Sequence, residues 1–168
     1  MKKITKFLSI MACAVVVALS GLLLGGCGGG KPYSLAGTTF RGTSECIIVW
    51  GESATQQDKE SLWAEFGVTN DEDCANKYAE NAGDFHSTIT FVFAEDGTVS
   101  MTYKEHEEPE THVFYFVQSE DLKSVQMYYD QEYTHKYLPI KFINGKYYLN
   151  ATPDSDYDMG IYIALVKE

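Results

Sequence analysis

The chain of 168 residues is 45% hydrophobic and 14% aromatic, and it carries a formal net charge of −11 at pH 7. This length suits one domain that buries its own core. Because so acidic a domain is repelled by nucleic-acid phosphates, its charge excludes DNA and RNA as partners.

The first 26 residues have the layout of an export signal. Lys2, Lys3 and Lys6 precede a mostly apolar run over 7–24, and this part contains no acidic residue. A basic start followed by an apolar stretch is typical of secretory signal peptides. Because the run is near the lower length limit of a membrane-spanning helix, an uncleaved anchor is an alternative, as is plain secretion.

The segment Leu24-Gly25-Gly26-Cys27 resembles the bacterial lipobox, in which the cysteine is lipidated and becomes the new N-terminus. The resemblance implies that 1–26 is removed and that Cys27 carries acyl chains such as palmitate. Two or more chains anchor a protein stably to a bilayer. Residues 27–32, which include three glycines, then form a flexible tether. We therefore expect a lipoprotein at the extracytoplasmic face of the cell membrane.

The mature chain is more acidic than the full sequence. Three of the 13 basic residues lie in the signal and none of the 24 acidic residues does, so the formal charge becomes −14. One monomeric domain is expected over 33–168. Its first segments, 37–41 and 45–50, have the composition of one or two strands.

Residues 53–82 interrupt the strand pattern and predict two short helices. Apolar side chains recur at helical spacing in both halves. Gly67 follows the first helix and Gly83 the second, and glycine favours a helix C-terminus. The candidate N-caps are Ser53 or Thr55 for the first helix and Thr69 for the second.

Cys46 and Cys74 are the cysteines that follow the lipidation site. In an exported protein such a pair predicts a disulfide. The bond would pin the helical segment to the strands, and it would stabilise the fold by about 3–4 kcal/mol on the chain-entropy model. Two separate thiols are the alternative.

From residue 85 onward the sequence predicts one strand after another. Residues alternate in character over 88–93 and 98–103, around Asp96-Gly97, which is a strong hairpin signal. Asn144-Gly145 marks a second hairpin. Pro139 lacks an amide donor, so its strand should bulge or lie at an edge. The remaining strands are expected at 111–118, 122–130, 136–143, 146–151 and 159–167.

Eight or nine short strands in meander order predict a mainly β fold. A sheet of this size closes into a barrel or folds into a sandwich, because exposed edges promote aggregation. Up-and-down order favours an antiparallel β-barrel, with the two helices inserted near the N-terminus.

Two acidic stretches have some features of metal sites. Asp154, Asp156 and Asp158 alternate like the first ligands of an EF-hand, but the glycine and the final glutamate of that motif are not in place. His106 and His112 lie among four glutamates without a familiar ligand spacing. We interpret the first stretch as a solvated turn, with weak calcium binding as the alternative. We interpret the second as a charged loop, with a zinc or nickel site as the alternative.

We predict no catalytic residue, no metal and no cofactor. No serine has a nucleophile-elbow context, and the remaining cysteines have no neighbouring basic residue that would activate them. Acidic residues are so frequent that a carboxylate pair for glycan hydrolysis stays open as a third hypothesis. His86 and His135 are interpreted as ordinary surface or sheet residues.

The motif formed by Leu35, Gly37 and Phe40, together with a later Phe93 and Asp96-Gly97-Thr98, resembles bacterial lipocalin-like lipoprotein domains. The resemblance implies a barrel with an apolar cavity. Classical lipocalins have tryptophan where Phe40 stands and lack so early a helical segment. By alternation, the inward residues that would line such a cavity include Phe91, Met101, Tyr103, Tyr115 and Met127.

The sequence therefore supports two functional hypotheses for the anchored domain. In the first, it binds a small, apolar ligand inside the barrel. In the second, the core is solid, and the domain binds an envelope or host protein through a tyrosine-rich, acidic surface. Ten of the 12 tyrosines follow residue 100, and Tyr128 and Tyr148 are the candidates for that surface.

Overall fold

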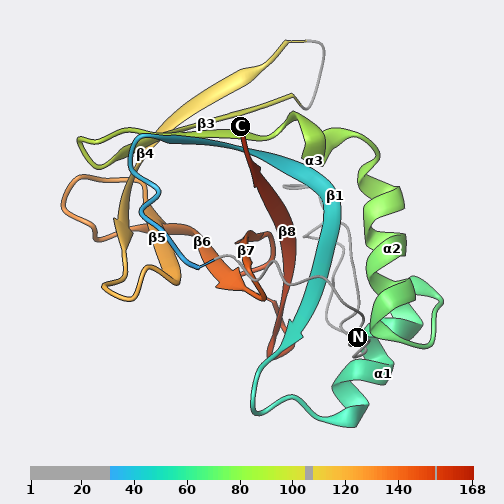
Figure 1. Ribbon diagram of the computed structural model, residues 1–168. Helices are drawn as coiled ribbons and strands as arrows, with labels where there is room; N and C mark the ends of the chain where they lie inside the picture. Colours follow the sequence, from blue (N-terminus) through green and yellow to red (C-terminus); the bar gives the residue numbers. More distant parts are fainter. Residues whose placement is uncertain (1–30, 105–107, 154) are drawn as a thin grey trace.

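The computed structural model describes residues 31–104, 108–153 and 155–168, which form a barrel with helices packed along one side (Figure 1). Among these residues no helix has both the length and the apolar character needed to cross a membrane. The elements in chain order are β1 (Thr38–Trp50), α1 (Gln56–Phe66), α2 (Asp71–Ala82), α3 (Phe85–Thr88), β2 (Thr90–Phe93), β3 (Thr98–Tyr103), β4 (Glu110–Gln118), β5 (Ser124–Tyr128), β6 (Lys136–Ile143), β7 (Lys146–Asn150) and β8 (Met159–Lys167).

Eight antiparallel strands form a closed barrel in which each strand pairs with the next and β8 pairs with β1. The predicted up-and-down barrel is confirmed. The two N-terminal segments predicted at 37–41 and 45–50 are one long strand, β1, whose register with β8 shifts between Gly42 and Cys46. A side chain at Gly42 would place its Cβ 2.4 Å from the backbone oxygen of His86. Glycine is therefore required where β1 bends against α3.

The predicted hairpin turns are present because their residues adopt left-handed backbone angles. Gly97 has φ 86°, and the Asp96 carboxylate accepts hydrogen bonds from the amide and hydroxyl of Thr98. Asn144 and Gly145 both have positive φ, at 48° and 91°, which is the requirement of a tight two-residue turn.

Pro139 causes the bulge that its missing donor predicts. It lies opposite Gln126, and the register between β5 and β6 shifts just beyond this pair. The Gln126 side-chain amide fills the gap by donating to the backbone oxygens of Met127 and Tyr137. Because the barrel is closed, the strand has no free edge.

The helices begin and end close to their predicted limits. Thr55, not Ser53, caps α1 in a reciprocal box with Asp58. Asn70, not Thr69, caps α2, because the Asn70 side chain accepts from the amide of Asp73. A third helix, α3, was not predicted. Its four residues are too few to show helical periodicity in the sequence.

The helical segment is fastened to β1 by both tryptophans of the chain. Trp50 on β1 and Trp63 on α1 each donate an indole N–H to Asp71, at 2.9 and 2.8 Å. Asp71 begins α2, which contributes Ala75 to the barrel core. In Figure 1, α2 lies alongside β1, and α1 lies near the C-terminal end of that strand.

The barrel has two distinct ends. We call one the tether end, because the chain enters it after residue 31, and it holds the turns 94–97, 119–123 and 144–145. The opposite far end holds the helical connection 51–89 and the loops that follow β3, β5 and β7. Antiparallel order fixes this division, since successive strands run in opposite directions.

The segment before β1 closes the tether end. Leu35 is fully buried, and its amide donates to Oε1 of Gln118 at 3.0 Å. The Tyr147 hydroxyl lies 2.7 Å from the backbone oxygen of Tyr33, 2.8 Å from that of Leu122 and 3.1 Å from the amide of Tyr33. The chain therefore crosses this end in a fixed position.

Candidate functional site

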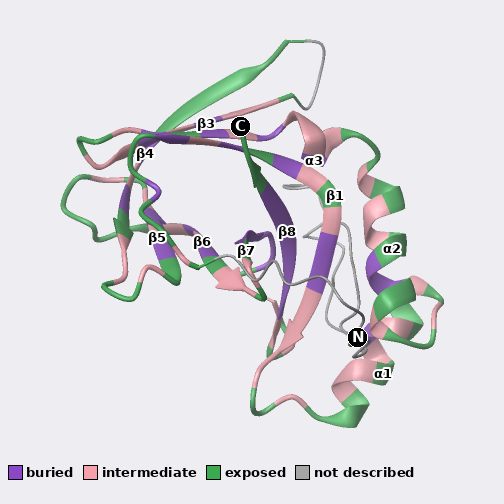
Figure 2. Ribbon diagram, in the orientation of Figure 1, coloured by how far each residue is buried: buried purple, intermediate pink, exposed green. Residues whose placement is uncertain are grey.

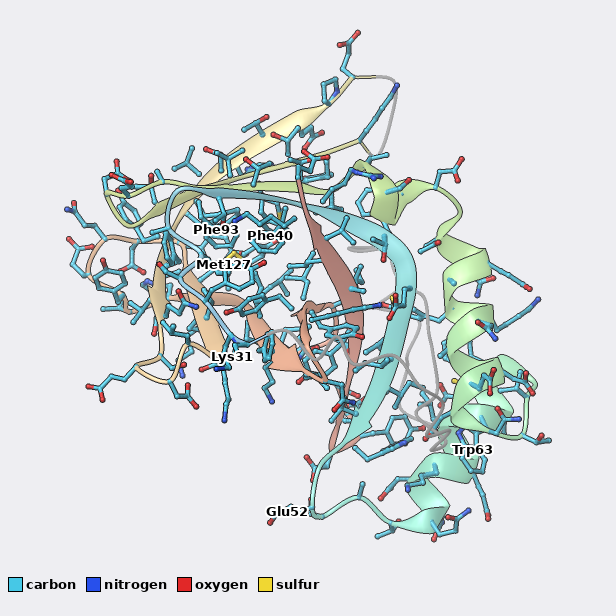
Figure 3. All side chains as sticks on the ribbon, in the orientation of Figure 1. Lys31, Phe40, Glu52, Trp63, Phe93 and Met127 are labelled. Carbon is cyan, nitrogen blue, oxygen red and sulfur yellow. The ribbon has the colours of Figure 1, made fainter. Side chains whose placement is uncertain are left out.

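The barrel interior is filled by its own side chains. Phe91 and Met127 have no exposed surface, and Met101 is also buried in the main hydrophobic cluster. Phe40, Phe93 and Met127 project together between the strands (Figure 3), and Figure 2 shows buried residues along β1, β5 and β8. An eight-stranded barrel is just wide enough for such filling. These three predicted lining residues are thus core residues.

Aromatic rings pack closely at the tether end of this core. Phe40 contacts Phe93 and Tyr147 with ring centroids 6.1 and 5.9 Å apart. Phe93 contacts Phe116 edge to face at 5.1 Å. Such edge-to-face pairs add stability beyond the area they bury, so these rings stabilise the tether end of the interior.

The other two predicted lining residues are not part of the buried core. Tyr103 is half-buried on the inward side of β3 at the far end, where its ring stacks on His112. Tyr115 points outward, because it alternates with the buried Phe114 and Phe116 on β4. Its assignment to the interior was wrong.

The outward side of β2–β5 carries no charged residue within those strands. We call this surface the outer face; it consists of Thr90, Val92, Thr98, Ser100, Thr102, Thr111, Val113, Tyr115, Val117, Ser124, Gln126 and Tyr128. Cross-strand pairing makes it continuous, since Ser100 lies between Val92 and Val113, and Tyr115 between Thr98 and Tyr128. An uncharged sheet surface on so acidic a domain is unlike the rest of its exterior.

Aromatic and aliphatic side chains stand exposed on the outer face. Val113 is 60% exposed and Val117 is 47% exposed. Tyr133, from the loop after β5, contacts Tyr115 and Tyr128 edge to face at 6.4 and 5.3 Å. Tyrosine is enriched at protein interfaces because its ring gives apolar contact and its hydroxyl a hydrogen bond.

Tyr148, the second tyrosine expected at the surface, is only 4% exposed. It points to the outside of the barrel but belongs to a second buried cluster with Ile47, Tyr162 and Ala164 on β1, β7 and β8. Its hydroxyl donates to Glu45, and burial raises the pKa of this phenol. Tyr148 is therefore not part of an exposed binding surface.

The predicted disulfide between Cys46 and Cys74 is not formed. Both residues are buried, one on β1 and one on α2, and Cys74 is a thiol. Burial raises the pKa of Cys74 to about 12, and the carboxylates of Asp71 and Glu65 contribute. Because thiolate is the species that forms disulfides, this environment makes Cys74 inert.

The aspartates before β8 serve a structural contact. Asp158 accepts hydrogen bonds from the amide and hydroxyl of Ser53, at 2.9 and 2.6 Å, and the Ser53 hydroxyl lowers its pKa. Asp154 lies outside the described residues. No group of three metal-ligating side chains occurs in the part of the chain that the structure describes.

The described histidines differ from one another in their surroundings, and of the two predicted as surface or sheet residues only His135 agrees. His86 is buried on α3, where it contacts Phe85, and is not a surface or sheet residue. His135 is exposed and interacts with Asp130 at 3.0 Å. His112 lies on β4, 3.6 Å from Glu110. His106 lies outside the described residues.

Comparison with known proteins gives no match to a family model, a curated protein or a solved structure. The functional argument therefore depends on the geometry. The closed barrel agrees with the fold that the lipocalin-like motifs imply. Sequence reasoning missed the outer face, although its signal was present: every second residue of β2–β5 is uncharged.

Proposed function

We propose that the protein is a lipid-anchored, extracytoplasmic interaction domain that binds a partner protein through the outer face. The observation that carries this proposal is the absence of charge from the outward positions of β2–β5 in a strongly acidic chain. Charged residues are depleted from the centres of protein interfaces, where desolvating them is costly. Exposed Val113, Val117 and Tyr133 supply the apolar contact.

The filled interior favours this function over ligand binding inside the barrel. A small apolar ligand would need space beside residues such as Phe91, Met127 and Ile140, all of which have no accessible surface. Admitting it would separate side chains that already pack against one another, and the free energy of those contacts would be lost.

Charged residues of both signs border the outer face. Glu95 and Asp96 lie in the turn before β3, Glu120 and Asp121 in the turn after β4, and Glu132 in the loop after β5. At the sides, Arg41 on β1 pairs with Thr90, and Lys136 and Lys141 on β6 pair with Tyr128 and Ser124. A complementary partner has an uncharged patch that is bordered by basic residues opposite the turns and by acidic residues opposite β1 and β6.

Anchoring is tested by replacing the cysteine of the lipobox. In cells fed a labelled fatty acid, the native protein should carry label and sediment with membranes, whereas Cys27→Ser should lose the label. An unlabelled native protein would contradict the anchor. The folded domain of the Cys27→Ser variant should keep its circular dichroism spectrum, since the strands of the barrel lie between Thr38 and Lys167.

Partner binding is tested by placing a photo-crosslinking residue at Val113 or at Glu72, which is exposed on α2. One dominant adduct should form on intact cells from position 113 and not from position 72. Val113→Lys in a chain crosslinked from position 117 should abolish the adduct, while Val113→Thr should preserve it. An adduct with a second copy, or equal adducts from both positions, would contradict the proposed partner.

A further inference from the structure

Six rings form a continuous aromatic wall at the far end of the barrel, separate from the outer face. It begins on α3, crosses the inward side of β3, β4 and β6, and ends in the loop after β5. Neighbouring centroids are 4.3–6.3 Å apart. In order, the members of the wall are Phe85, Tyr103, His112, Phe114, Tyr137 and Tyr129.

The wall rests on the core, and its exposed members are His112 and Tyr129. Phe114 is buried, and Phe85, Tyr103 and Tyr137 are half-buried against the main hydrophobic cluster. Tyr129 at the end of the wall is 58% exposed. Phe114 and Tyr137 stack almost in parallel, with an interplanar angle of 7°. The rings are thus held in place before any ligand arrives, which reduces the entropy cost of binding.

Acceptor groups border the wall. The Tyr103 hydroxyl donates to Glu110 at 3.0 Å and lies 3.4 Å from Nε2 of His112. Because the tyrosine proton is directed to Glu110, a ligand meets a carboxylate and not an additional donor. Both Tyr103 and Glu110 lie on the inward side of their strands, directly opposite each other. This border suits a ligand that carries positive charge.

The net charge of the far end also favours a cationic ligand. Its described basic residues are Lys59, Lys77, Lys104 and Lys136. Fifteen described acidic residues stand against these four, from the connection 51–89 and the loops or strand ends at 108–110, 130–132 and 156–158. Anionic ligands are repelled there and cations are concentrated.

We propose that the aromatic wall binds a small organic cation, an ammonium group attached to an apolar or hydroxylated body. The exposed ring of Tyr129, together with half-buried Tyr103 and Tyr137, attracts such a cation through the ring quadrupole. Glu110 adds an opposite charge at the border of the wall. This site does not depend on the partner proposed for the outer face, since the two surfaces lie on opposite sides of β3 and β4.

The test uses choline and its neutral isostere, in which carbon replaces the ammonium nitrogen. Each is titrated at pH 8 into the isotopically labelled, lipidated chain in a nonionic detergent, and amide and tyrosine-ring NMR shifts are followed. Choline should shift signals of Tyr103, Tyr129 and Tyr137, and the isostere should bind at least about fivefold more weakly, as expected for a cation–π contact. Equal binding of the two probes, or choline shifts confined to other residues, would overturn the proposal.

Variants assign the effect to the wall. Glu110→Gln lies at an exposed position and should weaken choline binding about threefold or more, since it removes only the charge. Tyr129→Leu should weaken it further, by loss of the exposed ring. Tyr115→Leu on the outer face is the matched control and should leave the affinity unchanged. Unchanged affinity in both Glu110→Gln and Tyr129→Leu would refute the site.

Discussion

The hydroxyl of Tyr147 should be worth about 1–3 kcal/mol to the fold, and Tyr147→Phe measures it. The ring is buried among Phe40 and Phe142 and stays in place in the variant. Only the hydroxyl is lost, which lies within hydrogen-bonding distance of both Tyr33 backbone groups and the Leu122 oxygen. One hydroxyl donates once and accepts, so the variant loses about two bonds at about 0.5–1.5 kcal/mol each.

Urea unfolding followed by circular dichroism gives the free energy change of Tyr147→Phe. Hydrogen exchange adds a local measurement, because loosening of the crossing segment should speed exchange of the Leu35 amide, which donates to Gln118. Tyr115→Phe, on the outer face, is the control and should change stability by less than about 0.5 kcal/mol. A loss below about 0.5 kcal/mol for Tyr147→Phe, with unchanged exchange at Leu35, would refute the role of the hydroxyl in closing the tether end.

Three further perturbations test other contacts. Gly42→Ala should destabilise the fold by about 1–3 kcal/mol in urea unfolding, because its Cβ would meet the rigid His86 backbone oxygen at 2.4 Å; a neutral effect would contradict the bend. Asp71→Ala should lower the free energy of unfolding by about 2–4 kcal/mol and red-shift tryptophan emission, because two indole donors lose a charged acceptor. An unchanged emission spectrum would contradict the role of Asp71 as that acceptor. A hydrogen bond from the backbone amide of Thr134 is the main cause that lowers the pKa of Asp130 from 3.8 to about 2. The ionised carboxylate therefore stabilises the fold above pH 4, and this stabilisation is lost as the pH falls to about 2. The melting-temperature difference between the native protein and Asp130→Asn should therefore close in that window, and a constant difference would contradict the assignment.

Local turn chemistry made most of the barrel predictable from the sequence. Asp96-Gly97 and Asn144-Gly145 fix two hairpins because their backbone angles are costly for most other residues. Pro139 indicated the bulge between β5 and β6 for a similarly local reason. The closure of β1 on β8 joins residues at opposite ends of the chain. We could predict this closure only because an open sheet would leave the backbone groups of its two edge strands unpaired, and no local sequence signal indicates it.

The sequence of β4 did not show which side of the strand faces the barrel interior. Both of its sides are apolar in the middle, with Phe114 and Phe116 on one and Val113, Tyr115 and Val117 on the other. Alternation alone does not say which set is buried. The Phe116 amide donates a hydrogen bond to the Gly97 oxygen, which fixes the register of β4 against β3. This hydrogen bond depends on the geometry of the turn in three dimensions. The misassignment of Tyr115 hid the outer face, because that residue lies near its centre.

The distribution of charge connects the proposed anchor with the proposed binding face. At the tether end the six described acidic residues are matched by six described basic ones, which are Lys31, Arg41, Lys123, Lys141, Lys146 and Lys167. The excess negative charge therefore lies at the far end. An anionic bilayer surface repels that end and tolerates the balanced one, so the proposed lipid on Cys27 and electrostatics favour the same orientation. With the tether end at the membrane, the outer face on the side of the barrel is open to a partner that diffuses laterally, and the aromatic wall is directed away from the bilayer.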